Sequence, residues 1–165
     1  MKIKPSAVDV SKCYICRLEK RLMGVIMPVA LKVRDVMEGN VVVIDGKQPA
    51  SEALKAMLKN QVWSVIVSVN GIPSGVVTDR DILRRVVAEG RDPKKVQLKD
   101  IMSCPLVTIS PDALFGEAWR LMTDKEIRRL YVVEEGKIIG RVTQTGLFNK
   151  LLEVTMALSS LKYSM

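Results

Sequence analysis

Histidine is absent from this 165-residue chain, and aromatic residues make up only 4% of it. Without an imidazole, proton transfer near neutral pH would need a carboxyl or amino group with a shifted pKa, and no paired acidic residues stand at a suggestive spacing. Cys104 has no sequence partner that would make it a nucleophile. We therefore predict no catalytic residues and no enzyme activity. With so few aromatics, Val, Ile, Leu and Met must fill the core.

Cysteine is scarce, with only Cys13, Cys16 and Cys104 in the chain. An odd number in a chain of this length argues against a secreted disulfide framework. Cys13-x-x-Cys16 has the spacing of half a zinc site, but one chain without histidine cannot supply four sulfur or nitrogen ligands. We therefore predict no metal site; a zinc site shared between two chains and a redox pair remain alternatives.

Long hydrophobic runs are also missing. The stretch Leu22–Leu31 is too short for the roughly 20 residues that cross a bilayer, so we expect a soluble cytoplasmic protein with no membrane partner. The net charge is +8, and residues 1–30 hold six basic residues against two acidic ones. Positive charge favours anionic ligands or surfaces. Nucleic-acid binding through this basic extension is an alternative function.

The remainder of the chain is dominated by a repeat. Val33–Met37 recurs as Leu98–Met102, and Gly75–Thr78 recurs as Gly140–Thr143, both 65 residues apart. A Glu-Ala-x-x-x-Met pattern lies between them in each copy, at residues 52–57 and 117–122. We name Val33–Met37 the first opener and Leu98–Met102 the second opener. One supersecondary unit built twice predicts a pseudo-twofold axis, a cleft and two candidate sites.

Each repeat predicts a strand, a helix, a hairpin and a closing helix. The first strands are expected at residues 41–44 and 106–109. Apolar side chains at helical spacing follow them, and Ser110-Pro111-Asp112 has the residues that favour a helix start. These apolar positions are Ala50, Ala53, Leu54, Met57 and Leu58, and then Leu114, Ala118, Leu121 and Met122. The order β-α-β-β-α, twice, is an α/β (α+β) fold.

The hairpins and closing helices have their own signals. Asn70-Gly71 and Glu135-Gly136 separate apolar runs and predict tight turns, because turns of this kind need positive φ. Gly90 suits a helix C-terminal cap. The apolar positions of the closing helices are Ile82, Leu83, Val86 and Val87, and then Leu147, Phe148, Leu151 and Leu152.

These patterns divide the chain into five parts. We expect a basic extension at 1–31, the first repeat at 32–90, a linker at 91–97 and the second repeat at 98–155. The tail at 156–165 is expected to begin as a helix.

The most informative motif is Gly75-Val76-Val77-Thr78-Asp79-Arg80-Asp81, where a predicted strand meets a predicted helix. Free backbone N–H groups at such a junction attract phosphate. Asp81 can accept two hydrogen bonds from a ribose diol, Thr78 can donate its hydroxyl, and Arg80 can bind phosphate oxygens. Thr78-x-x-Asp81 also fits a capping box, in which the two side chains satisfy the local backbone. These residues alone leave both interpretations open.

From about Lys32 to Thr155 the chain resembles a tandem pair of cystathionine β-synthase (CBS) domains. The resemblance rests on the two openers, the two Glu-Ala-x-x-x-Met helices and the Gly-x-x-Thr-Asp-Arg-Asp-Ile-Leu sequence of the first repeat. It implies a cleft between the repeats that binds adenosine derivatives, with Thr78 and Asp81 holding ribose and phosphate. Segments before the first strands and at the starts of the middle strands would line that site, here Cys104, Ile127 and Arg128.

The second repeat departs from this pattern, because Gly146 stands where the resemblance implies the ribose aspartate, although Thr143 is kept. Losing a hydrogen bond to a charged group weakens binding by about 10- to 150-fold. We therefore predict a second, weaker site at Val62, Trp63, Arg129 and Thr143. Arg128 and Arg129 either grip phosphate or are solvated strand-edge charges, and both interpretations stay open.

The resemblance also implies a ligand and partners. The expected ligand is AMP, ADP or ATP, with S-adenosylmethionine as an alternative and no further cofactor. The resemblance implies a homodimer and a regulatory module that senses energy state or a metabolite and acts on a partner protein that the sequence does not identify.

Overall fold

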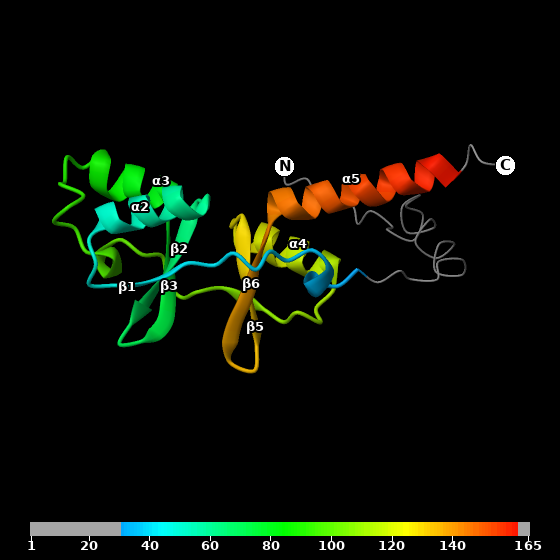
Figure 1. Cartoon of the computed structure of the whole chain (residues 1–165), viewed down its shortest axis with the longest axis horizontal. Helices are drawn as coiled ribbons and strands as arrows, with labels where there is room; N and C mark the ends of the chain where they lie inside the picture. The colour runs from blue at the N-terminus through cyan, green and yellow to red at the C-terminus, as the bar shows by residue number, and fades with distance from the viewer. Residues whose placement is uncertain (1–30, 162–165) are drawn as a thin grey trace, which may run out of the picture. The chain divides into compact units, whose positions relative to one another are not determined.

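The computed structural model describes residues 31–161, which form two three-stranded sheets, each accompanied by helices (Figure 1). Cys13, Cys16, nearly all of the basic extension and the last residues of the tail lie outside the described residues. The predictions made for them, including nucleic-acid binding, therefore remain predictions. In the described part of the chain, no helix is long and apolar enough to cross a membrane.

The first repeat forms the first sheet, in the strand order β1-β2-β3. β1 pairs in parallel with β2, and β2 pairs antiparallel with β3. Helix α2 packs on β2, and α3 continues directly into η3, a π-helical turn. The elements are η2 (Val33–Asp35), β1 (Val43–Asp45), α2 (Ala50–Asn60), β2 (Ser64–Val69), β3 (Ile72–Thr78), α3 (Asp79–Ile82) and η3 (Leu83–Val87).

The second repeat forms the second sheet with the same topology, in the order β4-β5-β6. Its hairpin is irregular at the equivalent place: the register shifts between Val132 and Val133, as it does between Val67 and Ser68 in the first. The duplication predicted from the 65-residue spacing is thus present in the backbone. The elements are η4 (Leu98–Asp100), β4 (Thr108–Ile109), α4 (Phe115–Asp124), β5 (Arg129–Glu134), β6 (Lys137–Thr143) and α5 (Gln144–Leu161).

Both predicted tight turns are confirmed by their backbone angles. Asn70 and Gly71 have φ of 52° and 80°, and Glu135 and Gly136 have φ of 49° and 76°. Two consecutive positive φ values give the turn whose twist matches that of the flanking strands. Gly90 has a positive φ of 65°, but it lies in the turn after η3, which ends at Val87 with Ala88 as its C-cap residue, so the glycine cap predicted there is wrong.

The two openers are exchanged between the hydrophobic cores. Val33 of the first opener is fully buried among second-repeat side chains such as Met122 and Leu130. Leu98 and Ile101 of the second opener are buried in the core of the first repeat. Burying each of these side chains contributes roughly 1.5–3 kcal/mol, so each repeat depends on the other to complete its core.

Backbone hydrogen bonds accompany this exchange. Glu38, which follows the first opener, exchanges two backbone hydrogen bonds with Arg141 of β6, with N···O distances of 2.8 and 2.9 Å. Ser103, which follows the second opener, does the same with Val76 of β3, at 2.8 and 3.0 Å. The chain therefore crosses between the repeats at two equivalent positions.

Glycine is required where these crossings pass the sheets. A Cβ atom on Gly75 would lie 2.7 Å from the Ser103 carbonyl oxygen, and one on Gly140 would lie 2.8 Å from the Glu38 carbonyl oxygen. Real Cβ atoms do not approach backbone oxygens so closely. The glycines of the repeated Gly-x-x-Thr motif are therefore needed for close contact with an opener.

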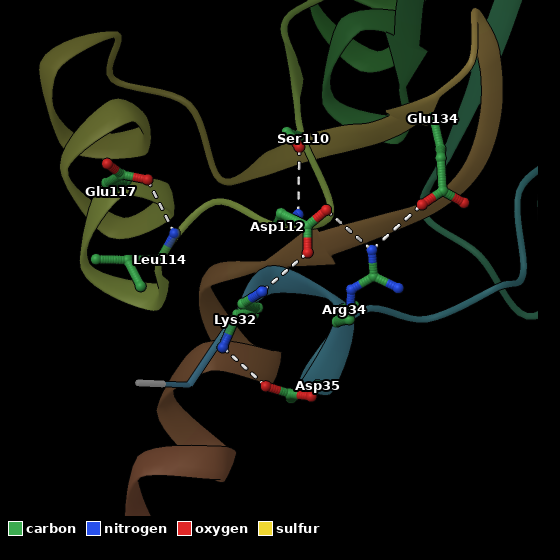
Figure 2. A network of polar contacts seen from close by, with 8 residues as sticks. All are labelled: Lys32, Arg34, Asp35, Ser110, Asp112, Leu114, Glu117 and Glu134. Carbon is green, nitrogen blue, oxygen red and sulfur yellow. Dashed lines mark hydrogen bonds and ion pairs between the residues drawn. The ribbon is translucent and has the colours of Figure 1, made fainter. Parts of the chain in front are cut away.

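Charged side chains form ion pairs between the first opener and the second repeat (Figure 2). Asp112 accepts from Lys32 at 3.0 Å and pairs with Arg34 at 3.2 Å, and Arg34 also reaches Glu134 at 3.2 Å. The hydrogen bonds from Lys32 and Arg34 hold the pKa of the Asp112 carboxyl below its ordinary value. All of these groups are exposed, so each pair contributes little to stability.

The predicted start of the second amphipathic helix is wrong. Ser110-Pro111-Asp112 forms a turn, and α4 begins only at Phe115. The carbonyl oxygens of Pro111 and Ala113 accept hydrogen bonds from the first opener instead of starting a helix. The helix then starts where Leu114 donates its backbone N–H to Glu117 at 2.8 Å, as Figure 2 shows.

The predicted first strands are also too long at their N-terminal ends. β1 begins at Val43 and β4 at Thr108, and the Leu106 N–H donates to the Ser74 carbonyl of the first sheet, so Leu106 does not extend β4.

Some side chains expected in the apolar stripes are exposed. The stripe of α2 reaches the core through Ala50, Ala53 and Met57, whereas Leu58 on the adjoining flank is 77% exposed. Of the apolar residues predicted for the closing helices, only Ile82, Val86 and Leu147 are buried, so these helices present a second apolar face outward. The exposed members are Leu83, Val87, Phe148, Leu151 and Leu152, and Leu114 before α4 is also exposed.

The close contact at Gly75 gives a stability prediction. Gly75→Ala should lower the free energy of unfolding by about 1–3 kcal/mol, because the added methyl group must displace the Ser103 carbonyl. Gly116→Ala on α4 is the matched control, since a Cβ there meets nothing within 4 Å and alanine favours a helix. Urea denaturation measures both, and equal stability of the two variants would contradict the close contact.

Candidate functional site

A cavity of about 530 Å³ contains residues of both repeats, and we name it the first pocket. β3 and α3 supply one wall, and the segments before β4 and β5 supply the other. Its volume lies in the usual range for small-molecule sites. All six residues predicted for the stronger site line it, namely Thr78, Arg80, Asp81, Cys104, Ile127 and Arg128.

Thr78 and Asp81 form the capping box of α3. The Thr78 backbone N–H and hydroxyl both donate to Asp81 Oδ2, at 2.9 and 2.7 Å, and the Asp81 N–H donates to Thr78 Oγ1 at 3.1 Å. The capping interpretation is therefore correct as geometry. It does not exclude a ligand, because these bonds leave Asp81 Oδ1 as an acceptor, and both residues line the first pocket.

Arg85, on the π-helical turn, holds the other side of this carboxylate. Its Nη2 lies 3.4 Å from Asp81 Oδ1 and donates to Ser103 Oγ at 3.1 Å, and its Nη1 donates to the Ile101 carbonyl. Asp81 is therefore tied through Arg85 to the second opener. Arg85 was not predicted as a site residue, although its place four residues after Asp81 on a predicted helix indicates contact with that carboxylate.

The first pocket carries more positive than negative charge. Arg80, Lys125, Arg128 and Arg129 stand against Asp79, Asp81 and Glu126. Burial lowers the pKa of the Arg129 guanidinium, an effect that nearby Asp79 and Asp81 partly oppose. An arginine remains charged even so, and a poorly hydrated guanidinium is a favourable partner for phosphate.

A second pocket of about 720 Å³ contains three of the four residues predicted for the weaker site, Trp63, Arg129 and Thr143. The fourth, Val62, is 2% exposed in the core of the first repeat and does not line this pocket, so its role as a site residue stays a prediction. The N–H of Val62 bonds to the Met57 carbonyl, which turns the chain back to the core at the end of α2. Arg128 and Arg129 line both pockets.

The missing aspartate changes the N-terminal cap of α5, the helix beside the second pocket. Thr143 Oγ1 accepts from the Gly146 N–H at 3.0 Å, but no carboxylate returns from the helix. Instead, Glu38 lines this pocket. Its Oε2 accepts hydrogen bonds from Arg141 Nη2 at 2.9 Å and from Arg141 Nε at 3.2 Å. The Arg141 side chain is only 11% exposed. Neither residue was singled out from the sequence.

One buried hydrogen bond connects the sheets beside the first pocket. Ser64 of β2 and Tyr131 of β5 are both buried, and their hydroxyl oxygens lie 3.0 Å apart. Burial raises the pKa of the Tyr131 hydroxyl above its ordinary value. Tyr131 lines the first pocket and was also missed, because a tyrosine in an apolar strand looks like an ordinary core residue.

Among residues 31–161, no three or more acidic, cysteine or histidine side chains are grouped to hold a metal ion. Cys104 is a free, exposed thiol at the edge of the first pocket.

Two repeated β-α-β-β-α units with exchanged openers and a pocket on each side of the pseudo-twofold axis define a class of protein, the duplicated ligand-binding module. A family model described as the CBS domain matches residues 33–88 and 98–153. The chain belongs to the CBS-domain family, and proteins of this family are typically regulatory rather than catalytic.

Relatives and solved structures agree with this assignment. The chain is 34% identical over 110 residues to the CBS domain-containing protein YhcV of Bacillus subtilis, covering 67% of this chain and 78% of that protein. It is 38% identical over 116 residues to the uncharacterized protein MK0525 of Methanopyrus kandleri, covering 69% of this chain but only 59% of that protein. A hexameric CBS-CP12 protein from bloom-forming cyanobacteria matches with a TM-score of 0.70 and 30% identity, over 74% and 69% of the two chains.

The bond between Ser64 and Tyr131 gives a second prediction. Tyr131→Phe should lower the free energy of unfolding by about 1–3 kcal/mol, because the Ser64 hydroxyl remains buried without its partner. The double variant Ser64→Ala/Tyr131→Phe should cost less than the sum of the two single variants. Thermal or urea unfolding of the four proteins measures this coupling, and strict additivity would contradict it.

Proposed function

We propose that this chain is a regulatory module that binds an adenine nucleotide, AMP, ADP or ATP, in the first pocket. The observation that carries the proposal is the convergence of Thr78 and Asp81 from one repeat with Cys104, Ile127 and Arg128 from the other. A ribose diol would donate to Asp81 Oδ1, and the phosphates would lie against Arg80 and Arg128. Val76, Pro105, Val107 and Ile127 offer apolar surface to the base.

The charge of the pocket supports a phosphate-bearing ligand over S-adenosylmethionine. Both ligands carry the adenosine diol, so Asp81 does not distinguish them. S-adenosylmethionine, however, places a positive sulfonium where a nucleotide places phosphate. The first pocket has one more cationic than anionic side chain, and this excess of positive charge favours phosphate over the sulfonium.

Regulation would follow from the shared walls of the pocket. A bound nucleotide touches both repeats, so it favours whichever arrangement of the repeats closes best around it. Arg85 contacts both Asp81 and Ser103, which follows the second opener. A ligand bound to Asp81 would therefore be connected through Arg85 to the crossing between the repeats. A partner protein that contacts both repeats would then sense occupancy.

We also propose that the chain forms a homodimer through the outer faces of its helices. Leu83 and Phe148 are equivalent residues of the two closing helices, 59% and 52% exposed, and Val87 and Leu152 are a second such pair. An apolar surface repeated about a pseudo-twofold axis suits a symmetric partner, and contiguous exposed apolar patches mark interfaces. The hexameric CBS-CP12 protein shows that a relative of this fold assembles.

Nucleotide binding is tested at Asp81. AMP or ATP at about 100 times its dissociation constant should stabilise the native protein by roughly 2.7 kcal/mol and raise its melting temperature. Asp81→Ala should abolish most of this shift. Asp81→Asn should keep an acceptor for the Thr78 N–H and still lose about 10- to 150-fold in affinity.

Glu117→Gln is the matched control, because Glu117 caps α4 from the same helix position and lines neither pocket. It should change stability without changing nucleotide affinity. No stabilisation by AMP, ADP or ATP would overturn the proposal, and stabilisation by S-adenosylmethionine alone would replace the ligand.

The homodimer is tested by charge on the outer face. Phe148→Glu should shift the sedimentation coefficient from dimer to monomer at micromolar concentration, because a desolvated carboxylate in an apolar interface is costly. Ile72→Glu, at another exposed apolar residue, on the β2–β3 hairpin, should leave the dimer intact. A monomeric native protein would contradict the proposal.

A further inference from the structure

The second pocket holds a carboxylate that the repeat does not predict there. Glu38 and Ser103 are equivalent residues, each following an opener and each exchanging two backbone hydrogen bonds with the neighbouring β3 or β6 strand. In the first pocket this position is a serine, and the carboxylate comes from the helix at Asp81. In the second pocket the helix has Gly146, and the opener side supplies a glutamate.

We propose that Glu38 replaces the missing aspartate as the acceptor for the ribose diol in the second pocket, where the sequence already predicts a weaker nucleotide site. This inference rests on the proposed function, because it assigns the same ligand class to a second place. It replaces the expectation that the loss at Gly146 leaves the second site without a diol acceptor.

The position of the Glu38 carboxylate supports this role. A Cβ atom built on Gly146 would lie 3.8 Å from Glu38 Oε1 and 3.2 Å from Thr143 Oγ1. Glu38 Oε1 therefore lies next to the space that an aspartate side chain at residue 146 would fill. The hydrogen bonds that Arg141 gives to Glu38 both end on Oε2, which leaves Oε1 to accept from a ligand.

In each pocket an arginine orients the carboxylate, but the two arginines stand at positions that are not equivalent in the repeats. In the first pocket Arg85 contacts Asp81 within one helix, and β3 has Val76. In the second pocket Arg141 replaces Val76 and pairs with Glu38 across the crossing. An 11% exposed arginine with two hydrogen bonds to one oxygen fixes the carboxylate before a ligand arrives, which lowers the entropic cost of binding.

The remaining walls suit a nucleotide. Arg128, Arg129 and Arg141 exceed Glu38 and Asp79 in charge, so the pocket attracts an anion. Trp63 is 67% exposed and lines the pocket, and its ring offers a stacking surface for a base. Thr143 provides the hydroxyl that Thr78 provides in the first pocket.

The test compares AMP with 2′-deoxy-AMP by isothermal titration calorimetry on the full chain. In Asp81→Asn protein, whose first pocket is weakened, we expect one AMP per chain to remain bound. The 2′-deoxy ligand should bind that site about 10- to 150-fold more weakly, because one hydroxyl no longer donates to a carboxylate. This comparison leaves Glu38 unaltered, so it does not depend on how a Glu38 variant folds.

Variants then assign the acceptor. Adding Glu38→Gln to Asp81→Asn should remove the preference for AMP over 2′-deoxy-AMP, and adding Gly146→Asp as well should restore it. Glu134→Gln is the matched control, since Glu134 is similarly exposed and also pairs with an arginine but lines neither pocket. It should change neither site.

The failures of the two proposals differ. If native protein binds one AMP per chain and Asp81→Asn protein binds none, the inference about Glu38 is overturned and the proposed function stands. An unchanged ribose preference in Glu38→Gln/Asp81→Asn protein also overturns it. If native protein binds no adenine nucleotide, both fall.

Discussion

The exchange of the two openers is the constraint on which the rest of the structure depends. Val33 completes the core of the second repeat, and Leu98 and Ile101 complete that of the first. The backbone contacts of Glu38 with Arg141 and of Ser103 with Val76 hold the crossings against the sheets, and Gly75 and Gly140 make room for them. Neither repeat can bury its apolar surface without the other, so the pair is one cooperative unit.

Both pockets are products of this exchange. The crossing after the second opener brings Ser103 and Cys104 to the first pocket, and the crossing after the first opener brings Glu38 to the second. Because the backbone is duplicated, a difference in side chains at equivalent positions translates directly into a difference between sites. The first pocket combines an aspartate with apolar walls, whereas the second replaces them with an ion pair and a tryptophan.

The duplication, both hairpin turns and six residues of the first pocket could be predicted because each leaves a local or repeated signal. Asn70-Gly71 dictates its own turn, and the 65-residue spacing aligns Thr78 with Thr143. The start of α4 could not be predicted. Ser110-Pro111-Asp112 favours a helix locally, but backbone carbonyls of this segment accept hydrogen bonds from the first opener, which is distant in sequence. Val62, predicted at the second pocket, is buried in the core of the first repeat, and a buried and a pocket-lining valine look alike in the sequence. Glu38 could not be predicted because it lies outside the repeated motifs, and only the fold brings its carboxylate beside Gly146.

The exchange has a mechanical consequence. Residue 31 meets the second repeat, where its carbonyl accepts from Phe115, and α5 leaves from β6 of that same repeat. The chain thus starts at the second repeat, forms the first repeat, and then returns to complete the second. Force applied at either end of the described segment, residues 31–161, would therefore act on the second repeat first, and on the first repeat only through the openers and the two crossings.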